Sequence, residues 1–471
     1  MRRLFDRDKI LKLNETYTFD VSVRDERKLF AGKLTLSPSK CTLRVMGERR
    51  PSYEFSQSTK IECSSFDKSF LLFELTTHYQ SSQTLQSTAD EHVGFFEYEF
   101  EVGFVICTDS RFNSFETAVS FSIDADMNKK WVGYTKHQKR LVDKFHTRKL
   151  NPLSVDALEF TQELEGYGCL NLFYDCEIHG HSDNFTSGMN FPPKLKVKFD
   201  TPILMENLHF EYKKFYDLMT LLIGSDFKVD IVEVVGERNK FSSNVSAYFP
   251  VTQKTYERDY PVFPLSHNQM FHSLPIPEFP LDAFNKYYRL PEDERITFTR
   301  YLRYRRVRSE EERFLGYFRL LESLVYKSKS YVEPDALTEL LGNSEASIIE
   351  KLKGKGSAKD IRKLISRIGR LNKSKYNTSK CLIDYYAKLP SELKQSIDFD
   401  NQGIEKVCKL RNDITHANAY SVDEKTLHKY ISFVNMLLCV ALFEKIGVHP
   451  ELSSMVVHRL DGFHHIQDYS Y

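Results

Sequence analysis

The sequence lacks several patterns that define large classes of proteins. Its eight cysteines are scattered from Cys41 to Cys439, and none forms a C-x-x-C pair. This scatter predicts reduced thiols, as in a cytoplasmic protein, rather than a disulfide framework. Neither a P-loop nor a G-x-S-x-G motif is present, so these two kinds of active site are not predicted.

The chain also lacks an excess of charge and a long hydrophobic run. Its formal net charge is +1 over 471 residues, so any nucleic-acid-binding surface must be a local basic patch. The longest apolar run, residues 433–443 interrupted by Asn435, is too short to span a bilayer. The first residues contain no apolar core of a signal peptide. We therefore expect a cytoplasmic protein without a membrane segment.

Tryptophan is almost absent, whereas the many other aromatic residues favour a strand-rich region. One Trp stands against 36 Phe and 26 Tyr. Residues 1 to about 125 alternate between polar and apolar in short segments, which predicts a sandwich or a curled antiparallel sheet. The polar residues 81–88 predict a loop within it. Helical periodicity at 128–149 and 207–222, the latter stopped by Gly224, adds a few helices.

The second half of the chain changes to helical periodicity. A proline-rich passage predicts the linker: Pro261, Pro264, Pro275, Pro277 and Pro280. We place the domain boundary after residue 285, between a sandwich-like, β-rich domain (1–285) and an all-α helical bundle (286–471). The predicted class is thus α+β with two domains. Ser309 with Glu312, and Ser421 with Glu424, each predict a capping box at the start of a bundle helix.

The most informative stretch is Arg411-Asn412-Asp413-Ile414-Thr415-His416. It lies late in a predicted helix, whose apolar residues Ile404, Val407, Leu410 and Ile414 fall at helical spacing. Helical geometry places Asn412 beside His416 and turns Arg411 and His416 about 140° apart. One copy is therefore poorly arranged to hold one phosphate, whereas two copies facing each other could surround it. On spacing alone, a surface arginine and a capping histidine are the alternative interpretation.

Three passages resemble the ApeA-like branch of the HEPN superfamily. Residues 312–322 are similar to the first helix of that family, and residues 407–416 are similar to its R-N-x-x-x-H motif. Residues 32–38, 44–47, 131–133 and 215–224 resemble parts of the ApeA N-terminal domain. The resemblance covers most of the chain and is strongest at 309–325 and 404–443.

The resemblance implies a metal-independent endoribonuclease of antiviral, abortive-infection defence. It implies no cofactor, a homodimer with the site at its interface, and an RNA substrate, with tRNA one candidate. The β-rich domain would then sense or restrain, with a phage-derived trigger. Attack by the neighbouring 2′-OH would leave 2′,3′-cyclic phosphate and 5′-OH ends.

The residues of the motif suit this chemistry. His416 can transfer protons because imidazole titrates near neutral pH. Arg411 can stabilise the phosphate oxygens, and Asn412 could fix the His416 tautomer or orient the phosphate. For Glu322 two interpretations stay open, catalytic support or a polar contact between helices. Asp413 and Thr415 are interpreted as packing or capping residues.

Local basic segments are the candidate RNA-binding surfaces. Eleven basic residues and one acidic residue lie between Lys351 and Lys380. The helix expected here has an apolar stripe of Ile361, Leu364, Ile365, Ile368 and Leu371. Four of the basic residues share the opposite face: Lys359, Lys363, Arg367 and Arg370. An RNA-backbone contact and a simple solvated face explain this pattern equally well. Residues 300–308, where arginines alternate with Tyr301 and Tyr304, are a second candidate.

A zinc cluster is considered and not predicted. Cys169, Cys176, His179 and His181 are close in sequence, but strand alternation turns Cys176 away from the two histidines. The alternative function kept beside the nuclease is a non-catalytic dimerisation or RNA-binding scaffold whose β-rich domain binds a ligand.

Overall fold

The computed structural model divides into two compact units, Met1–Pro291 and Glu292–Tyr471. It describes residues 10–25, 28–49, 55, 59–87, 92–108, 115–146, 157–175, 177–181, 186–238, 241–251, 258–267, 276–327, 330–372 and 377–469. Strands dominate the first unit and helices the second, which confirms the predicted fold class. The boundary placed after residue 285 falls inside α4 (Asp282–Arg289).

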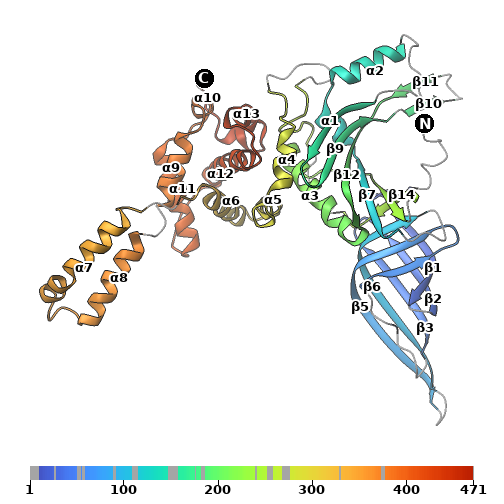
Figure 1. Cartoon of the computed structure of the whole chain (residues 1–471), viewed down its shortest axis with the longest axis horizontal. Helices are drawn as coiled ribbons and strands as arrows, with labels where there is room; N and C mark the ends of the chain where they lie inside the picture. Colours follow the sequence, from blue (N-terminus) through green and yellow to red (C-terminus); the bar gives the residue numbers. More distant parts are fainter. Residues whose placement is uncertain are drawn as a thin grey trace. The chain divides into compact units, whose positions relative to one another are not determined.

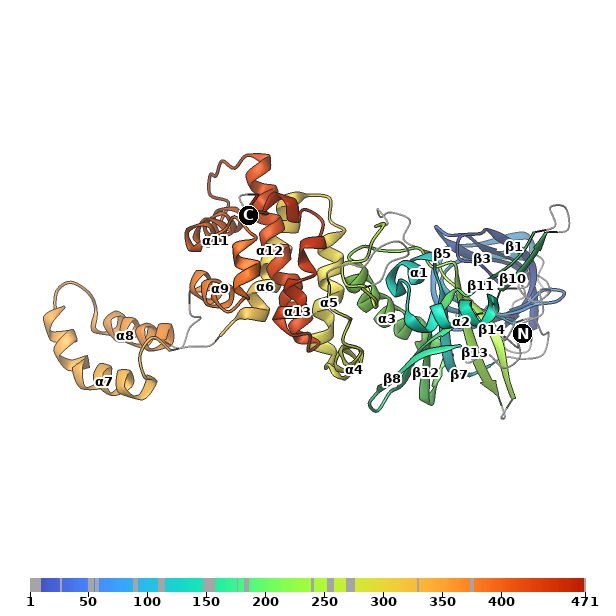
Figure 2. The same ribbon diagram turned by 90° about the horizontal axis from the view of Figure 1, so that it is seen from above.

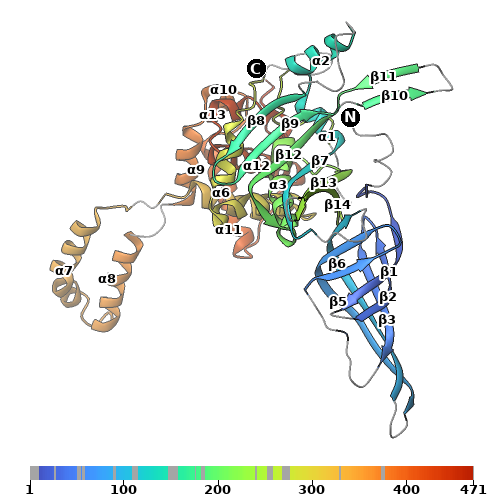
Figure 3. The same ribbon diagram turned by 45° about the vertical axis from the view of Figure 1, so that its right-hand side comes forward.

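The N-terminal unit is built on one twelve-stranded antiparallel sheet, in the order β3-β2-β1-β4-β5-β6-β14-β13-β7-β12-β9-β8. Its first six strands are β1 (Tyr17–Asp25), β2 (Lys28–Leu36), β3 (Cys41–Arg49), β4 (Ile61–Ser64), β5 (Ser69–Ser87) and β6 (His92–Thr108). Because β3 also pairs with β6, these six strands close into a barrel (Figure 3). Of the two arrangements left open, the structure therefore has the curled sheet.

The sheet continues beyond the barrel through six more strands. They are β7 (Thr117–Asp124), β8 (Leu158–Leu164), β9 (Gly168–Tyr174), β12 (Pro193–Leu204), β13 (Ile231–Arg238) and β14 (Phe241–Tyr248). A separate hairpin joins β10 (Glu177–His181) to β11 (Thr186–Asn190). Strand β9 shows the alternation that the sequence predicts, with Leu170, Leu172 and Tyr174 buried and the residues between them partly exposed.

Two predictions about this unit are wrong in detail. Residues 81–87 belong to β5 and pair with β6, for example Ser82 with Phe96. The backbone hydrogen bonds of a strand do not require apolar side chains, so the polar composition of this segment wrongly predicted a loop. Thr88 lies outside the described residues. Within the helical stretch predicted at 128–149 there are two helices, α1 (Asp126–Val132) and α2 (Lys136–His146), separated at Gly133 with φ 67°; residues 147–149 lie outside the described residues.

The helix predicted at 207–222 is confirmed as α3 (Leu208–Ile223), and η2 (Met205–Asn207) precedes it. Gly224 ends α3 in the left-handed conformation, at φ 81°. Of its residues, Phe215, Leu218 and Leu222 are fully buried. This helix therefore supplies part of the apolar core of the N-terminal unit.

The proline-rich passage is part of the core of the N-terminal unit rather than a linker. The buried Trp131 donates its indole N–H to the carbonyl of Phe263 at 3.0 Å, and its own carbonyl accepts from Leu265 N at 2.8 Å. Phe279 packs edge-on against Trp131. The single tryptophan therefore holds this irregular segment against the core. Pro275 lies outside the described residues.

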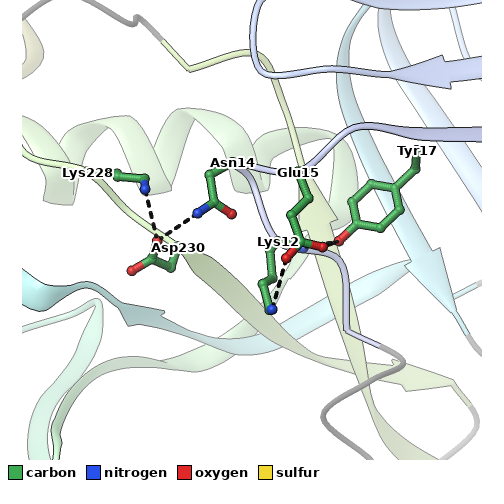
Figure 4. A network of polar contacts seen from close by, with 6 residues as sticks. All are labelled: Lys12, Asn14, Glu15, Tyr17, Lys228 and Asp230. Carbon is green, nitrogen blue, oxygen red and sulfur yellow. Dashed lines mark hydrogen bonds and ion pairs between the residues drawn. The ribbon is translucent and has the colours of Figure 1, made fainter.

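A small polar network fixes the segment before β1 (Figure 4). Glu15 accepts from Lys12 Nζ at 2.9 Å and from the Tyr17 hydroxyl at 2.8 Å, and these contacts lower the pKa of Glu15. Asn14 donates to Asp230 at 3.3 Å, beside an ion pair of Lys228 with Asp230 at 3.8 Å. The network joins the start of the barrel to the segment before β13. Because its members are largely exposed, it positions the chain more than it stabilises it.

The C-terminal unit is a helical bundle. Its longer helices are α5 (Glu292–Arg305), α6 (Glu310–Val325), α7 (Pro334–Lys351), α8 (Ala358–Asn372), α9 (Thr378–Ala387), α11 (Asn401–Thr415) and α12 (Glu424–Lys445). Short elements are α10 (Ser391–Gln395), α13 (Pro450–Ser454), η3 (Val457–Arg459) and η4 (Phe463–His465). Helix α12 packs along α6, and α6 and α11 both contact α9.

Helix α12 is the core helix of this unit. Twelve of its residues are buried, from Ile431 to Phe443. Its length and composition alone would allow it to cross a membrane. The apolar run 433–443 counted in the sequence is shorter than the helix and did not indicate this. Because 72% of its most apolar window is buried inside the unit, that property is weak support for a membrane span.

The predicted caps of the bundle are confirmed at one helix and wrong at another. Ser309 Oγ accepts from Glu312 N at 3.3 Å at the start of α6. At α12, however, the cap is Asp423, whose carboxylate accepts from Thr426 N at 2.9 Å. Aspartate caps a helix as well as serine does, so Ser421 was a near alternative two residues upstream.

Helices α7 and α8 form a hairpin that lies away from α12 (Figures 1 and 2). Asn372 closes its base by donating to the Val332 carbonyl at 2.8 Å and accepting from Val332 N at 2.9 Å. On α8 the predicted apolar stripe is only partly buried, at Ile361 and Ile365. The sequence did not predict α7, which has no buried residue.

Candidate active site

Helix α11 carries the motif and is anchored at both ends. Asp400 caps its start by accepting from Gly403 N at 2.7 Å. Ile404, Val407 and Leu410 are buried along one face, as the periodicity predicts. The helix ends at Thr415. The motif therefore occupies the last turn of a firmly packed helix.

Arg411 is held by side chains on two helices. Its Nη2 donates to Glu322 Oε2 at 2.8 Å, and its Nη1 donates to Asn412 Oδ1 at 2.9 Å. Its guanidinium also lies over the ring of Phe318, 5.4 Å from the centroid. Planar guanidinium groups favour both bidentate and stacked contacts of this kind. The Arg411 head group is therefore fixed in orientation before any ligand arrives.

Glu322 connects three helices. It extends from α6, accepts from Arg411 of α11 through Oε2, and accepts from Thr378 Oγ1 of α9 at 2.7 Å through Oε1. The side chains of Arg411 and Glu322 are only 23% and 14% exposed, so their attraction is screened less than that of a surface pair. Of the two interpretations kept for Glu322, this geometry corresponds to the polar contact between helices, and it also orients Arg411.

His416 is the C-cap residue directly after α11, and it is exposed. Its main-chain N–H donates to the Asn412 carbonyl at 2.9 Å. The next residue, Ala417, has a positive φ of 53°, and Asn418 folds back onto Asp413 through its main-chain N–H at 2.9 Å. This tight turn ends the helix directly after His416.

Asn412 was expected to lie beside His416 on the helix, but its side chain is turned toward Arg411. Its side chain contacts Arg411, and only its main-chain carbonyl contacts His416. Asp413 accepts from the Asn418 side chain at 3.2 Å, in keeping with the capping role predicted for it. Asn412 is therefore placed to orient the arginine, and its role toward the His416 ring stays a prediction.

Cys408 lies one turn before Arg411 and is buried. Burial raises the pKa of its thiol to about 12, against smaller lowering effects from a hydrogen bond with Ser379 and the charge of Arg411. A thiol with that pKa is protonated at neutral pH and is a poor nucleophile. Cys408 therefore has a packing role in the corner where α6, α9 and α11 meet, and it is not a nucleophile there.

The other predicted surfaces divide into exposed and buried residues. All four α8 residues, Lys359, Lys363, Arg367 and Arg370, are exposed. In the 300–308 segment, Tyr301 is buried and stacks on Tyr317 at 5.6 Å, so it is a core residue. The Cys176 of the rejected zinc cluster lies outside the described residues. No group of metal-ligating side chains occurs in the described part of the chain.

Two contact residues of the site were missed by sequence reasoning, Phe318 and Thr378. Thr378 is 56 positions from Glu322 in sequence, and Phe318 lies on a different helix from Arg411. Phe318 was inside the passage that resembled the family's first helix, which was the available signal. Nothing local in the sequence marks Thr378.

The β-rich unit and the helical bundle that follows it each match a known family model. The family model described as Apea-like HEPN matches residues 315–452, and the one described as ApeA N-terminal domain 1 matches residues 16–273. The chain belongs to the ApeA-like HEPN family. No curated protein and no solved structure matches it.

The two domains together indicate a nuclease-type protein of antiphage defence. The HEPN family generally includes ribonucleases, and its domains generally dimerise and act on RNA.

Proposed function

We propose that this protein is a cytoplasmic, metal-independent endoribonuclease of the abortive-infection type. One observation carries the proposal: Arg411 is fixed by Glu322 and Asn412 at the end of α11, where His416 is exposed. A cation held in place and an exposed imidazole near the same helix end are groups that phosphodiester cleavage by an internal nucleophile can use.

The reaction uses a nucleophile that RNA itself supplies. The 2′-oxygen attacks the adjacent phosphorus, its proton passes to a base, and the bond from phosphorus to the 5′-oxygen breaks as that oxygen gains a proton. A 2′,3′-cyclic phosphate and a 5′-OH end result. His416 carries one of these protons, and a histidine suits both roles because imidazole titrates near neutral pH.

Arg411 stabilises the negative charge that grows on the phosphate oxygens. A guanidinium has five N–H donors, and the contacts with Glu322 and Asn412 leave donors free for a phosphate. Because the head group is already oriented, little reorganisation is needed as charge develops. The ion pair with Glu322 lowers the net charge at the site, so a second cation favours phosphate binding.

A homodimer supplies that second cation. Two α11 ends that face each other bring two copies of Arg411 and two of His416 to one phosphodiester. One histidine then accepts the 2′-OH proton while the other protonates the leaving oxygen. The exposure of His416 and of the turn at Ala417 supports this arrangement, because both remain open to a partner.

The exposed cations of α8 extend the RNA contact. Lys359, Lys363 and Arg370 share one side of the helix, where they can follow a phosphate backbone. Arg367 lies at the margin of this face. The N-terminal unit senses a phage-derived trigger and restrains the nuclease, and a structured RNA such as tRNA is the substrate class.

The test is cleavage of total RNA by the purified full chain in EDTA, with and without extract from phage-infected cells, followed by mapping of the ends. We expect cyclic phosphate and 5′-OH ends. His416→Ala and Arg411→Ala should each reduce cleavage by about 10²-fold or more. Retained cleavage in either variant would show that these residues are not the catalytic pair.

Matched controls come from exposed residues of the same type. Lys409→Ala removes a cation from the other side of α11, and His449→Ala removes an exposed histidine at the cap of α13. Both should cleave like the wild type. Equal losses in the controls would indicate a general defect rather than loss of the site.

The alternative is a non-catalytic scaffold whose β-rich unit binds a ligand. One observation favours it: Glu322 neutralises Arg411 and joins three helices. The contacts among Glu322, Arg411 and Thr378 therefore also serve the packing of the bundle. This alternative predicts no RNA cleavage under any condition of the test. It also predicts that His416→Ala leaves function in phage defence unchanged.

A further inference from the structure

The α7–α8 hairpin buries too little of its apolar surface for a two-helix element. No residue of α7 is buried, and only Ile361, Ile365 and Asn372 are buried on α8. Helices gain most of their stability from the packing of an apolar face, and a pair with so few buried residues is marginal by itself. The hairpin therefore has the character of an element completed by a partner.

An exposed apolar strip runs along one side of this hairpin. Leu364 and Ile368 on α8 are 53% and 38% exposed, and Leu340 on α7 is 62% exposed. On α8, Leu364 and Ile368 are turned by about 80° and about 40° from the direction midway between the buried Ile361 and Ile365. Leu340 is turned by about 100° from the centre of the half-buried face of α7, and for antiparallel helices the displacements on the two helices point to the same side of the hairpin.

The position of Leu340 along the hairpin follows from an ion pair between the helices. Arg362 Nε contacts Glu345 Oε1 at 2.9 Å, which sets the level at which α7 and α8 face each other. Five residues toward the start of α7 correspond to five residues toward the end of α8. Leu340 is thus level with Arg367 and next to Ile368, so the three apolar residues form one strip.

The two helices carry opposite charge. Helix α7 has four acidic residues and one lysine, whereas α8 has five basic residues and one aspartate. Glu339 borders the strip on the outer edge of α7, and Arg367 borders it on the outer edge of α8, at nearly the same level. A surface with an apolar centre, one acidic edge and one basic edge is complementary to itself when it is turned by a twofold axis.

We propose that this hairpin is a self-association element, whose apolar strip (Leu340, Leu364 and Ile368) packs on the same strip of a second copy of the chain. With the twofold axis parallel to the helices, α7 of one copy lies over α8 of the other. Glu339 of each copy then meets Arg367 of the other copy. Four helices bury the strip, and two ion pairs fix its register.

This surface is separate from the α11 corner, and the inference does not depend on RNA cleavage. Of the four basic residues assigned to RNA, only Arg367 borders the strip. Lys359, Lys363 and Arg370 stay on the outer side of the four-helix arrangement. The hairpin can therefore associate and still present a basic face.

A charge exchange tests the register in the full-length chain by sedimentation equilibrium. Glu339→Arg and Arg367→Glu should each weaken association by about tenfold or more, because like charges then face each other across the strip. The double variant with both changes should recover wild-type association. Lys363→Glu, on the outer side, is the matched control and should associate like the wild type.

Cross-linking provides a second readout that is independent of any other dimer contact. A chain with Glu339→Cys and Arg367→Cys should form a covalent dimer on mild oxidation. The chain with Glu339→Cys alone should not, because the two copies of that residue lie on opposite edges.

Two results together would overturn the proposal: wild-type association in both single charge variants, and no cross-linked dimer from the double cysteine chain. If Arg367→Glu and Lys363→Glu instead weaken RNA binding equally with association unchanged, the hairpin is an RNA-binding arm. A hairpin that packs on the N-terminal unit of its own chain would likewise give no cross-linked dimer.

Discussion

Two arginine–glutamate pairs in the C-terminal unit have nearly the same length and very different surroundings. Arg411–Glu322 measures 2.8 Å, with side chains 23% and 14% exposed, and lies where α6, α9 and α11 meet. Arg362–Glu345 measures 2.9 Å, with side chains 64% and 40% exposed, on the α7–α8 hairpin. Distance alone therefore does not separate a group fixed for chemistry from an ordinary surface contact; burial and further partners do.

The same contrast holds for the apolar residues of the two regions. Around Arg411, the side chains of Phe318, Val407 and Leu410 are buried. On the hairpin, Leu340 and Leu364 are mostly exposed. One copy of the chain buries the side chains that support Arg411, whereas the hairpin leaves much of its apolar surface exposed. The following predictions test that difference, beginning with the largest effect.

Truncation of an apolar side chain should give the largest difference in free energy of unfolding between the two regions. Phe318→Ala removes a fully buried ring beneath Arg411 and should lower the free energy of unfolding by about 3–5 kcal/mol. Leu364→Ala on the hairpin should change it by less than about 0.5 kcal/mol at concentrations where the chain is monomeric. Denaturant unfolding of both variants measures the difference, and similar losses would remove the contrast.

Removal of each glutamate tests the two ion pairs directly. Glu322→Ala leaves the partly buried charge of Arg411 without its partner and should destabilise by about 2–3 kcal/mol. Glu345→Ala should cost about 0–1 kcal/mol. In 1 M salt the small effect at Glu345 should disappear while most of the effect at Glu322 remains, because salt screens exposed charges more strongly. A salt-sensitive loss at Glu322 would contradict its shielding.

The buried thiol of the corner predicts a dependence on alkaline pH. Because the pKa of Cys408 is raised to about 12 in the folded chain, its stabilising contribution is complete below pH 9 and is lost as the pH rises toward 12. The loss is at most about 1.4 kcal/mol per pH unit for this group. Denaturant unfolding at pH 8, 9 and 10 measures this: the difference in free energy of unfolding between the wild type and Cys408→Ala should become smaller at each higher pH. Parallel curves would show that Cys408 does not contribute.

The smallest effect concerns the second partner of Glu322. Thr378→Val removes the hydrogen bond to Glu322 Oε1 while keeping the shape of the side chain, and should cost about 1–2 kcal/mol. We also expect a modest loss of RNA cleavage, because Glu322 then holds Arg411 less firmly. Thr338→Val on α7, whose hydroxyl bonds only the Pro334 carbonyl, is the matched control and should have little effect.

How much the sequence could predict follows from how local each feature is. Helix α11 was predicted because Ile404, Val407 and Leu410 repeat at helical spacing, and α3 because Gly224 marks its end. The same reasoning missed α7, whose apolar residues face no core, and it extended burial along α8 to Leu364, which is exposed. Periodicity indicates which face is apolar and not whether anything covers it.

The site was predictable in its members more than in its contacts. Arg411, Asn412, His416 and Glu322 could be chosen from the motif and the family resemblance. The contact of Asn412 with Arg411, instead of with the His416 ring, depends on rotamers in the last helical turn. Thr378 reaches Glu322 only through the packing of α9 on α6, which no pattern near either residue specifies.

The clamp between Asn372 and Val332 has a consequence for how this protein can vary. The chain leaves for α7 and returns from α8 at almost one point, so residues 333–371 are attached like an inserted module. A short turn could take the place of the hairpin at that point. The hairpin is therefore a part that can be lengthened, exchanged or deleted independently of the corner that holds Arg411.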